Sequence, residues 1–84
     1  EEVKDATVAV RKEYERYQAL SKSVRNMQRV LSSMRDKYRE GLIEFSDMLT
    51  TEQNLLTAQN NLAASGGTVY RNIITFYKAV GGGY

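Results

Sequence analysis

Four residue types are missing from the 84-residue chain: cysteine, histidine, proline and tryptophan. The absence of cysteine and histidine removes disulfides, the usual zinc ligands and the side chains that most often act as nucleophile or general base. No apolar run approaches the roughly 18 residues of a membrane-spanning helix. We therefore expect no enzymatic activity, no cofactor and no metal site, and a fold stabilised by helix packing or by neighbouring molecules.

The formal net charge is small, +2, but its distribution along the chain is uneven. Residues 16–39 carry seven basic side chains against the single acid Asp36. A nucleic-acid surface would need these charges on one face, with aromatic residues for base stacking or a recognisable docking motif, and neither is evident. We expect no nucleic-acid partner and interpret the segment as a solvated helix face or one that lies against an acidic neighbour.

The first half of the chain has no glycine before Gly41, and its apolar residues follow a helical period. They are spaced by threes and fours with one irregularity, which is the pattern of a coiled-coil seam. The predicted seam consists of Val10, Tyr14, Tyr17, Leu20, Val24, Met27, Leu31, Met34 and Tyr38. The pattern predicts one helix over about residues 2–39, roughly 57 Å long at 1.5 Å per residue.

The second half carries two apolar stripes. One has strict three-four spacing and consists of Phe45, Met48, Glu52, Leu55, Gln59, Leu62, Gly66, Val69, Ile73, Phe76 and Val80. The other takes every seventh residue: Leu49, Leu56, Ala63, Tyr70 and Tyr77. A helix with one partner needs a single seam, so the second stripe predicts a second neighbour, as in a bundle or a closed ring. The remaining face, which includes Thr50, Asn54 and Thr57, is polar and mostly uncharged, and it suits bulk solvent or a water-filled channel.

Gly66 and Gly67 leave two folds open. SGGT can end one helix and begin another, which predicts a three-helix bundle with helices near 3–39, 46–64 and 69–80. Each glycine also costs a helix interior about 1 kcal/mol relative to alanine. The three-four stripe nevertheless passes through Gly66 without a change of phase, and a loop has no reason to preserve phase. We therefore predict one continuous helix with close packing at the two glycines.

The stretch YREGLIEFSD, residues 38–47, joins the two predicted helices. Gly41 permits a tight or left-handed turn. It is followed by Leu42, Ile43 and Phe45, where an ordinary turn would be polar. Apolar side chains exposed at a turn indicate a surface that another molecule covers.

Acidic residues cluster around the same turn, at Glu40, Glu44, Asp47 and Glu52. Such carboxylates could form an acid pair or a site for a hard cation. Asp47 is explained more simply as a first-turn acid that favours the helix dipole and supplies a cap, and Ser46 competes for the same capping role. We therefore predict a structural role for Asp47 from local sequence alone.

Two separated blocks resemble a known family. They are YREGLIEFSDMLTTEQNLLTAQ at 38–59, followed by LA at 62–63, and FYKAVGGG at 76–83. They are similar to the C-terminal helical hairpin of the TolC-like outer-membrane efflux channels, most closely to the lipoprotein-type, NodT-like branch, whose chains carry an LYKALGGGW-like segment. The distance between the two blocks agrees with the family without a gap.

The resemblance implies an all-α fold, a long antiparallel, coiled-coil-like helical hairpin that is an excerpt of a trimeric periplasmic α-barrel. Residues 1–84 would form a single hairpin, with helices over about 2–39 and 47–80, a tip turn at 40–46 and a glycine-rich end at 81–84. The implied function is a passive conduit for export of drugs or other small molecules, hence multidrug resistance. The implied partners are a periplasmic adaptor protein and an inner-membrane efflux transporter, with the homotrimeric channel in the outer membrane and this segment in the periplasm.

The resemblance also implies roles for individual residues. The periplasmic tip would dock the adaptor through Gly41, Leu42, Ile43 and Phe45. The pore entrance would be formed by Tyr38, Glu44, Asp47 and Thr50, with three copies of Asp47 making an acidic ring. Helix packing would involve Leu49, Leu56, Gly66, Gly67, Tyr70 and Tyr77.

The chain departs from the family pattern at two positions. Thr50 stands where many members have a second aspartate, and Ile43 stands where some have an arginine that ties the closed entrance. Part of the acidic ring and the tie are therefore not supported by this sequence. Outside a ring, the second stripe would be uncovered, and we expect the isolated fragment to self-associate. The alternative function is a self-standing coiled-coil interaction or scaffold module.

Overall fold

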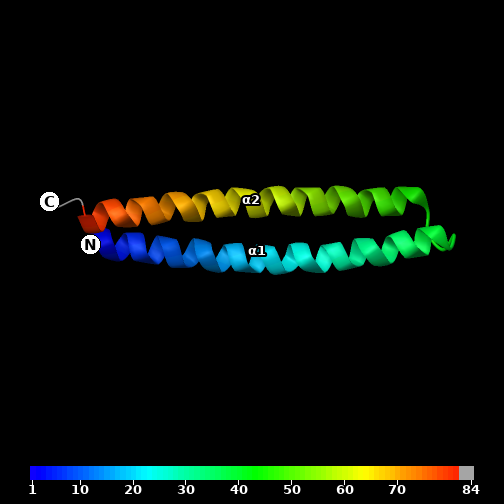
Figure 1. Ribbon diagram of the computed structural model, residues 1–84, viewed down its shortest axis with the longest axis horizontal. Helices are drawn as coiled ribbons and strands as arrows, with labels where there is room; N and C mark the ends of the chain where they lie inside the picture. Colours follow the sequence, from blue (N-terminus) through cyan, green and yellow to red (C-terminus); the bar gives the residue numbers. More distant parts are fainter. Residues whose placement is uncertain (82–84) are drawn as a thin grey trace.

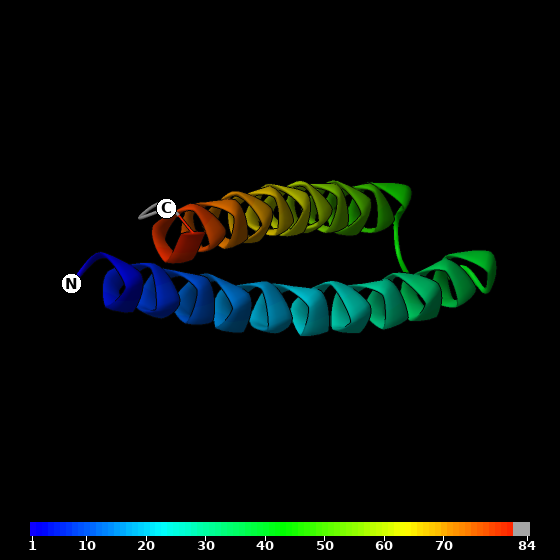
Figure 2. The same cartoon turned by 60° about the vertical axis from the view of Figure 1, so that its left-hand side comes forward.

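The computed structural model describes residues 1–81 and contains two α-helices. Helix α1 spans Glu2–Arg39 and helix α2 spans Phe45–Gly81. The helices run antiparallel and stay side by side along their whole length (Figures 1 and 2), in a rod with extents of 65 × 14 × 13 Å. The all-α hairpin predicted from the sequence is confirmed. Over residues 1–81 neither helix has a stretch apolar enough to cross a membrane.

Both helices have charged residues at their ends that interact favourably with the helix dipole. Acids lie in the first turn of each helix and basic residues in the last turn, so the side-chain charges oppose the helix dipole. The acids are Glu2, Asp5 and Asp47, and the basic residues are Lys37, Arg39 and Lys78. With no proline in the sequence, no position forces a kink in either helix.

Helix α2 runs through Gly66 and Gly67 without a break, so the three-helix alternative is wrong. The reason lies on α1, where the ring of Tyr17 packs against Gly66. A Cβ added at Gly66 would lie 3.2 Å from Tyr17 Cε2, closer than ordinary contact. The missing side chain lets the aromatic ring approach the backbone of α2, and this contact offsets part of the cost of glycine in a helix.

The seam of α1 passes through Glu13 and not, as predicted, through Tyr14. The Glu13 side chain is only 18% exposed, whereas Tyr14 is 49% exposed. With Glu13 in the seam, the spacing from Val10 through Tyr17 becomes three and then four, and the irregularity in the predicted pattern disappears. The sequence prediction chose Tyr14 because it is apolar, whereas the neighbouring Glu13 is the residue that faces α2.

The inner face of α2 also differs from the prediction in one of its two rows. The large apolar row is as predicted, and it consists of Met48, Leu55, Leu62, Val69 and Phe76. The second inner row consists of small or polar residues, Thr51, Ala58, Ser65, Asn72 and Ala79, each one position before the predicted residue. Ile73 and Val80 of the predicted row are exposed. Small side chains in this row allow the two helix backbones to approach each other closely.

The apolar core is short and lies in the half of the hairpin nearer the turn. Its buried residues are Val24, Leu31 and Leu55, and the residues packed against them are Met27, Met48, Ala58 and Leu62. We call residues 18–64 the tip half, and residues 2–17 with 65–81 the open half. In the open half the buried residues are Ala6 and Ser65.

Helix α2 begins at Phe45, two residues earlier than predicted. The Glu44 carbonyl accepts hydrogen bonds from the backbone N–H groups of Asp47 at 3.1 Å and Met48 at 3.4 Å. These bonds bring Phe45 and Ser46 into the first helical turn. The helix extends through Gly81, and the rest of the predicted glycine-rich end, 82–84, lies outside the described residues.

Candidate functional site

The turn between the helices is built around one left-handed residue, Gly41, whose φ is 76°. The Gly41 N–H donates to the Tyr38 carbonyl at 3.0 Å, and the Leu42 N–H donates to the Lys37 carbonyl at 2.8 Å. This pair of bonds is the Schellman motif, which satisfies the last carbonyls of a helix. Any residue with a Cβ would strain the backbone at Gly41. The motif also ends the helix before Leu42, whose side chain is 66% exposed.

Asp47 caps the start of α2. Its Oδ2 accepts a hydrogen bond from the Glu44 backbone N–H at 3.3 Å, so the carboxylate satisfies a donor three residues before it, as in one half of a capping box. The same charge favours the helix dipole. Ser46 lies inside the first turn, where its carbonyl accepts a bond from the Thr50 hydroxyl at 3.0 Å. Of the two predicted caps, the geometry selects Asp47.

Two aromatic rings connect the ends of the helices at the tip. The ring centroids of Tyr38 and Phe45 are 5.8 Å apart with an interplanar angle of 59°, a favourable tilted arrangement. Both rings remain accessible, at 41% and 55% exposure. Ile43 is half-buried. The tip thus combines a rigid turn with exposed apolar side chains on both of its sides.

Ion pairs lie just behind this apolar surface. Arg35 Nη2 is 3.5 Å from Glu52 Oε1, which joins the two helices, and Arg39 Nη1 is 3.6 Å from Asp36 Oδ1 within α1. All four side chains are well exposed, so each pair contributes little to stability. Among residues 1–81, no three histidine, cysteine, aspartate or glutamate side chains gather closely enough to hold a metal ion.

The predicted docking and entrance residues meet at one end of the hairpin, but the structure does not separate them into two groups. Tyr38, predicted for the pore entrance, packs on Phe45, predicted for adaptor docking. Ile43 is half-buried beneath this end, and the other predicted tip residues, Gly41, Leu42, Glu44, Asp47 and Thr50, are exposed.

The residues predicted for helix packing lie in two places. Leu49, Leu56, Tyr70 and Tyr77 form a row on the outside of α2, at 40%, 58%, 67% and 69% exposure. They do not pack between α1 and α2. Gly66, by contrast, lies under Tyr17, and Gly67 is half-buried beside it. The outer row is free for a neighbour beyond the hairpin.

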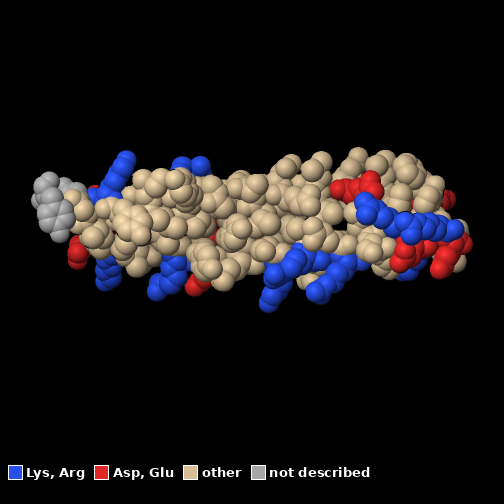
Figure 3. Space-filling view, viewed as in Figure 1, with Lys and Arg blue, Asp and Glu red and all other residues tan. Residues whose placement is uncertain are grey.

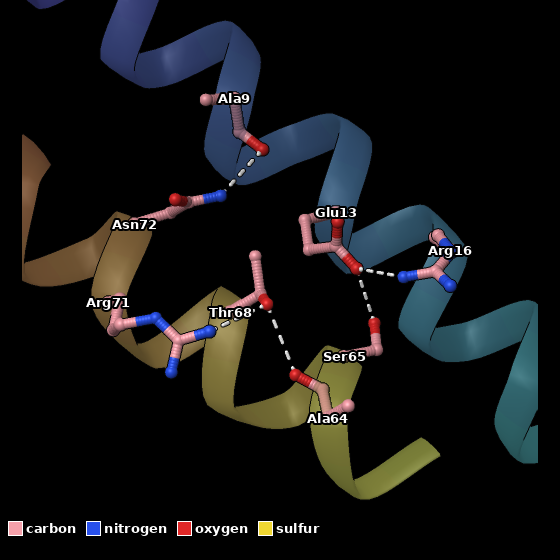
Figure 4. A network of polar contacts seen from close by, with 8 residues as sticks. All are labelled: Ala9, Glu13, Arg16, Ala64, Ser65, Thr68, Arg71 and Asn72. Atoms are coloured by element: carbon pink, nitrogen blue, oxygen red, sulfur yellow. Dashed lines mark hydrogen bonds and ion pairs between the residues drawn. The ribbon is translucent and has the colours of Figure 1, made fainter. Parts of the chain in front are cut away.

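A polar site between the helices, in the open half, was missed by the sequence prediction. Ser65 has 0% exposure, and its hydroxyl donates to Glu13 Oε2 at 2.5 Å (Figure 4). Arg16 Nη1 donates to the same oxygen at 3.0 Å. Further along α2, the Asn72 side-chain amide donates to the Ala9 carbonyl at 3.3 Å. The Ser65 and Asn72 bonds cross between the helices, beside the half-buried apolar residues Val69 and Phe76.

The hydrogen bonds change the acidity of the Glu13 carboxylate. The Ser65 hydroxyl, and after it the Arg16 guanidinium, lower the pKa of Glu13 below its ordinary value of about 4.5, because both donate to the charged form. Desolvation acts in the opposite direction but is weaker. The sequence did contain a signal for this site. Strict three-four spacing along α1 places Glu13 between Val10 and Tyr17, although Glu13 is not apolar.

Together these features define a class of protein segment: a long antiparallel two-helix hairpin with a glycine-closed tip and an exposed apolar row on its outer side. A family model, that of the outer membrane efflux proteins, matches residues 1–82. The chain belongs to that family and is part of an outer-membrane efflux channel. Searches of curated proteins and of solved structures give no match.

Proposed function

We propose that this chain supplies one hairpin of one protomer in a homotrimeric channel of the lipoprotein-type, NodT-like branch. The channel would act as a passive conduit, not an enzyme, for drugs or other small molecules delivered by an inner-membrane transporter through a periplasmic adaptor. The hairpin would lie in the periplasm. The family match supports a role in an efflux channel. A rod 65 Å long suits a wall element of a helical tunnel.

The tip would form the docking surface for the adaptor. The observation that carries this proposal is the 66% exposure of Leu42 on a turn fixed by two backbone hydrogen bonds. The residue after the glycine of a Schellman motif often packs on the last helical turn, but Leu42 leaves most of its surface exposed and so remains available to a partner. Phe45 and Ile43 would extend the same surface, which a partner would desolvate on binding.

The pore entrance would lie beside the docking surface. Asp47 is exposed even though it caps α2, so its carboxylate remains accessible to a solute. Three copies around a narrow opening would focus a negative potential and attract cations. Tyr38, Glu44 and Thr50 would complete the entrance, with Glu44 adding negative charge where Thr50 adds none.

The outer row of α2 would contact the next helix of the tunnel wall. Leu49, Leu56, Tyr70 and Tyr77 are large and exposed, and a wall helix needs a neighbour on each side. In the absence of that neighbour, the same row would drive self-association of the isolated hairpin.

The docking proposal is tested by Leu42→Asp in the full-length channel. A buried charge without a partner is costly, so we expect the variant to lose at least tenfold in drug resistance while trimer formation is unchanged. Val30→Asp is the matched control, because Val30 is also an exposed apolar residue, at 52%, but lies on α1 away from the tip. Normal resistance of Leu42→Asp, or an equal loss in Val30→Asp, would remove the tip from the binding model.

A further inference from the structure

Two rows of exposed residues with seven-residue spacing run along the outside of the hairpin. We call Leu49, Leu56, Ala63, Tyr70 and Tyr77 on α2 the apolar row. We call Arg11, Gln18, Arg25, Ser32 and Arg39 on α1 the basic row. Seven-residue spacing keeps the members of each row on one side of their helix.

A groove in the open half shows that the two rows border the same face. The groove has a volume of about 400 Å³ and receives side chains from both helices: Thr7, Val10, Arg11, Tyr14, Ile73, Phe76 and Tyr77. Arg11 of the basic row and Tyr77 of the apolar row therefore lie along one concave surface. Arg11 is its one charged lining residue among residues 1–81, and no acid of that range lines it.

Acidic residues flank the basic row near its two ends, at Glu15 and Asp36, but are absent from its middle. The sequence has no acid between Tyr17 and Arg35, and no charged residue at all between Glu52 and Arg71. In the space-filling view, basic side chains gather along the α1 edge, while the surface over the middle of α2 is free of charge (Figure 3). Within residues 1–81, Arg11 and Arg25 form no ion pair, and Arg39 pairs only with its neighbour Asp36.

We propose that this face binds an amphipathic helix from outside the chain that carries an apolar stripe and, next to it, a stripe of aspartate or glutamate. The apolar stripe would pack on Leu56, Tyr70 and Tyr77, and the carboxylates would pair with Arg11 and Arg25. From Arg11 to Arg39 the face is about 42 Å long at 1.5 Å per residue, which corresponds to about four heptads of a partner helix. The inference rests on the proposed function in one respect: the partner helix is taken to be the neighbouring helix of the tunnel wall.

Charge complementarity favours this occupant over a second copy of the hairpin. A copy has no acidic row with seven-residue spacing to place against the basic row, since its tip half lacks acids over residues 18–34 and charges of any kind over residues 53–64. Like charges placed opposite one another would disfavour the pairing of two basic rows. Self-association of the free hairpin would therefore use the apolar row alone and yield to an acidic partner.

The arrangement also disfavours a membrane or a nucleic acid. A helix that lies on an anionic membrane is rich in lysine and arginine over its polar face, whereas α2 carries no charged residue over residues 53–70. The basic row alternates with Gln18 and Ser32 and contains no aromatic residue on which a base could stack. Regular heptad spacing in both rows instead suits the side-chain packing of another helix.

The test uses the 84-residue chain and two synthetic helical peptides, each about four heptads long to match the face. One peptide carries leucine in one heptad position and glutamate in the adjacent one, and the control peptide carries glutamine in place of glutamate. Sedimentation and NMR titration at low salt measure binding and stoichiometry. We expect a one-to-one complex with the acidic peptide that binds at least about fivefold more tightly than the control peptide and weakens as salt is raised.

Two double variants locate the contact. Arg11→Gln/Arg25→Gln should weaken binding of the acidic peptide about tenfold, whereas Lys12→Gln/Lys37→Gln, with the same change of net charge off the basic row, should change it by less than about twofold. Equal loss in both variants, or equal affinity for both peptides, would overturn the proposal. Tighter binding to vesicles of anionic phospholipid or to single-stranded DNA would also overturn it, as would a hairpin dimer that the acidic peptide does not dissociate. None of these outcomes affects the expected drug resistance of the Leu42→Asp variant. The docking proposal for the tip and the present proposal can therefore be disproved independently.

Discussion

The two halves of the hairpin share one helical period but bury different kinds of side chain. The tip half buries Val24, Leu31 and Leu55 in a continuous apolar cluster. The open half has Ser65 as its fully buried side chain, with Glu13 bonded to it across the seam. Removal of apolar area from water stabilises a fold by about 25 cal/mol per Å², so most of the hairpin's own stability arises in the tip half.

The open half mixes large and polar side chains on its inner face. Tyr14, Tyr70 and Tyr77 lie outside at 49–69% exposure, and serine, asparagine and glycine lie between the helices beside the half-buried Val69 and Phe76. A hairpin selected for its own stability alone would place the tyrosines inside. Their exposed position suits the neighbouring helix proposed above, which would cover the outer face.

The largest effect that tests this comparison comes from truncating the tip-half core. Leu31 is 5% exposed, and Leu31→Ala should lower the free energy of unfolding by about 3 kcal/mol through lost contacts and a cavity. A matched pair sharpens the comparison. Val24→Ala removes two buried methyl groups and should cost about 1.5 kcal/mol, whereas Val69→Ala, at a half-buried seam position of the open half, should cost less than half as much.

Urea unfolding of the three variants at one protein concentration gives these values. The fixed concentration matters because self-association would add to the apparent stability. If Val69→Ala costs as much as Val24→Ala, the open half is as well packed as the tip half and the comparison fails.

The architecture was predictable from the sequence because it depends on period and on the placement of glycine. No residue before Gly41 interrupts α1, and the stripe of α2 keeps its phase through Gly66. Gly41 also marked the turn, because glycine is the residue that most often adopts the left-handed conformation just after the last turn of a helix. These features are local or periodic, so they can be recognised in a single amino-acid sequence.

The inner surface was less predictable because it depends on the separation of the helix backbones. Thr51 and Glu52 both continue a three-four pattern from Met48, and counting apolar residues favours the row of Glu52, Ile73 and Val80. The structure uses the row of Thr51 and Ser65, whose small side chains allow close approach. At the tip, the contact between Tyr38 and Phe45 was likewise not readable, because it depends on how the turn orients one helix end against the other.

A smaller effect tests the close approach at the glycine pair. A Cβ at Gly67 would meet only the far end of Arg71, with Nη1 at 3.4 Å, so Gly67→Ala should raise the free energy of unfolding by about 1 kcal/mol through helix propensity. Gly66→Ala gains the same propensity but pushes the Tyr17 ring, 3.2 Å from the new Cβ, and should change stability by about zero. Thermal unfolding of both variants measures the difference. A gain at Gly66 equal to that at Gly67 would show that Tyr17 does not hold the helices at that distance.

The smallest effect concerns the acid dependence of the open half. The pKa of Glu13 is lowered in the folded chain, first by the Ser65 hydroxyl and then by Arg16. Its contribution to stability is therefore fully present above the ordinary pKa of about 4.5 and is lost as the pH falls through the lower folded value. Ser65→Ala should raise the pKa of Glu13 toward its ordinary value and reduce the loss of stability between neutral and acidic pH. Arg16→Gln should raise it by less, since Arg16 is the second cause.

NMR titration of the Glu13 side-chain carboxyl in the parent chain and the two variants measures these shifts directly, and Thr68→Ala is the control, because the Thr68 hydroxyl bonds to the Ala64 carbonyl and not to Glu13. A merely structural effect of Ser65→Ala would loosen the open half and move the resonances of Asn72 and Tyr17 without raising the pKa of Glu13. A larger rise in Arg16→Gln than in Ser65→Ala would mean that the ion pair on the surface, not the buried hydroxyl, holds the charge. In that case the contact of Glu13 with Ser65 would contribute as little to stability as an exposed ion pair does. The tip half and the open half would then differ only in how much apolar surface they bury.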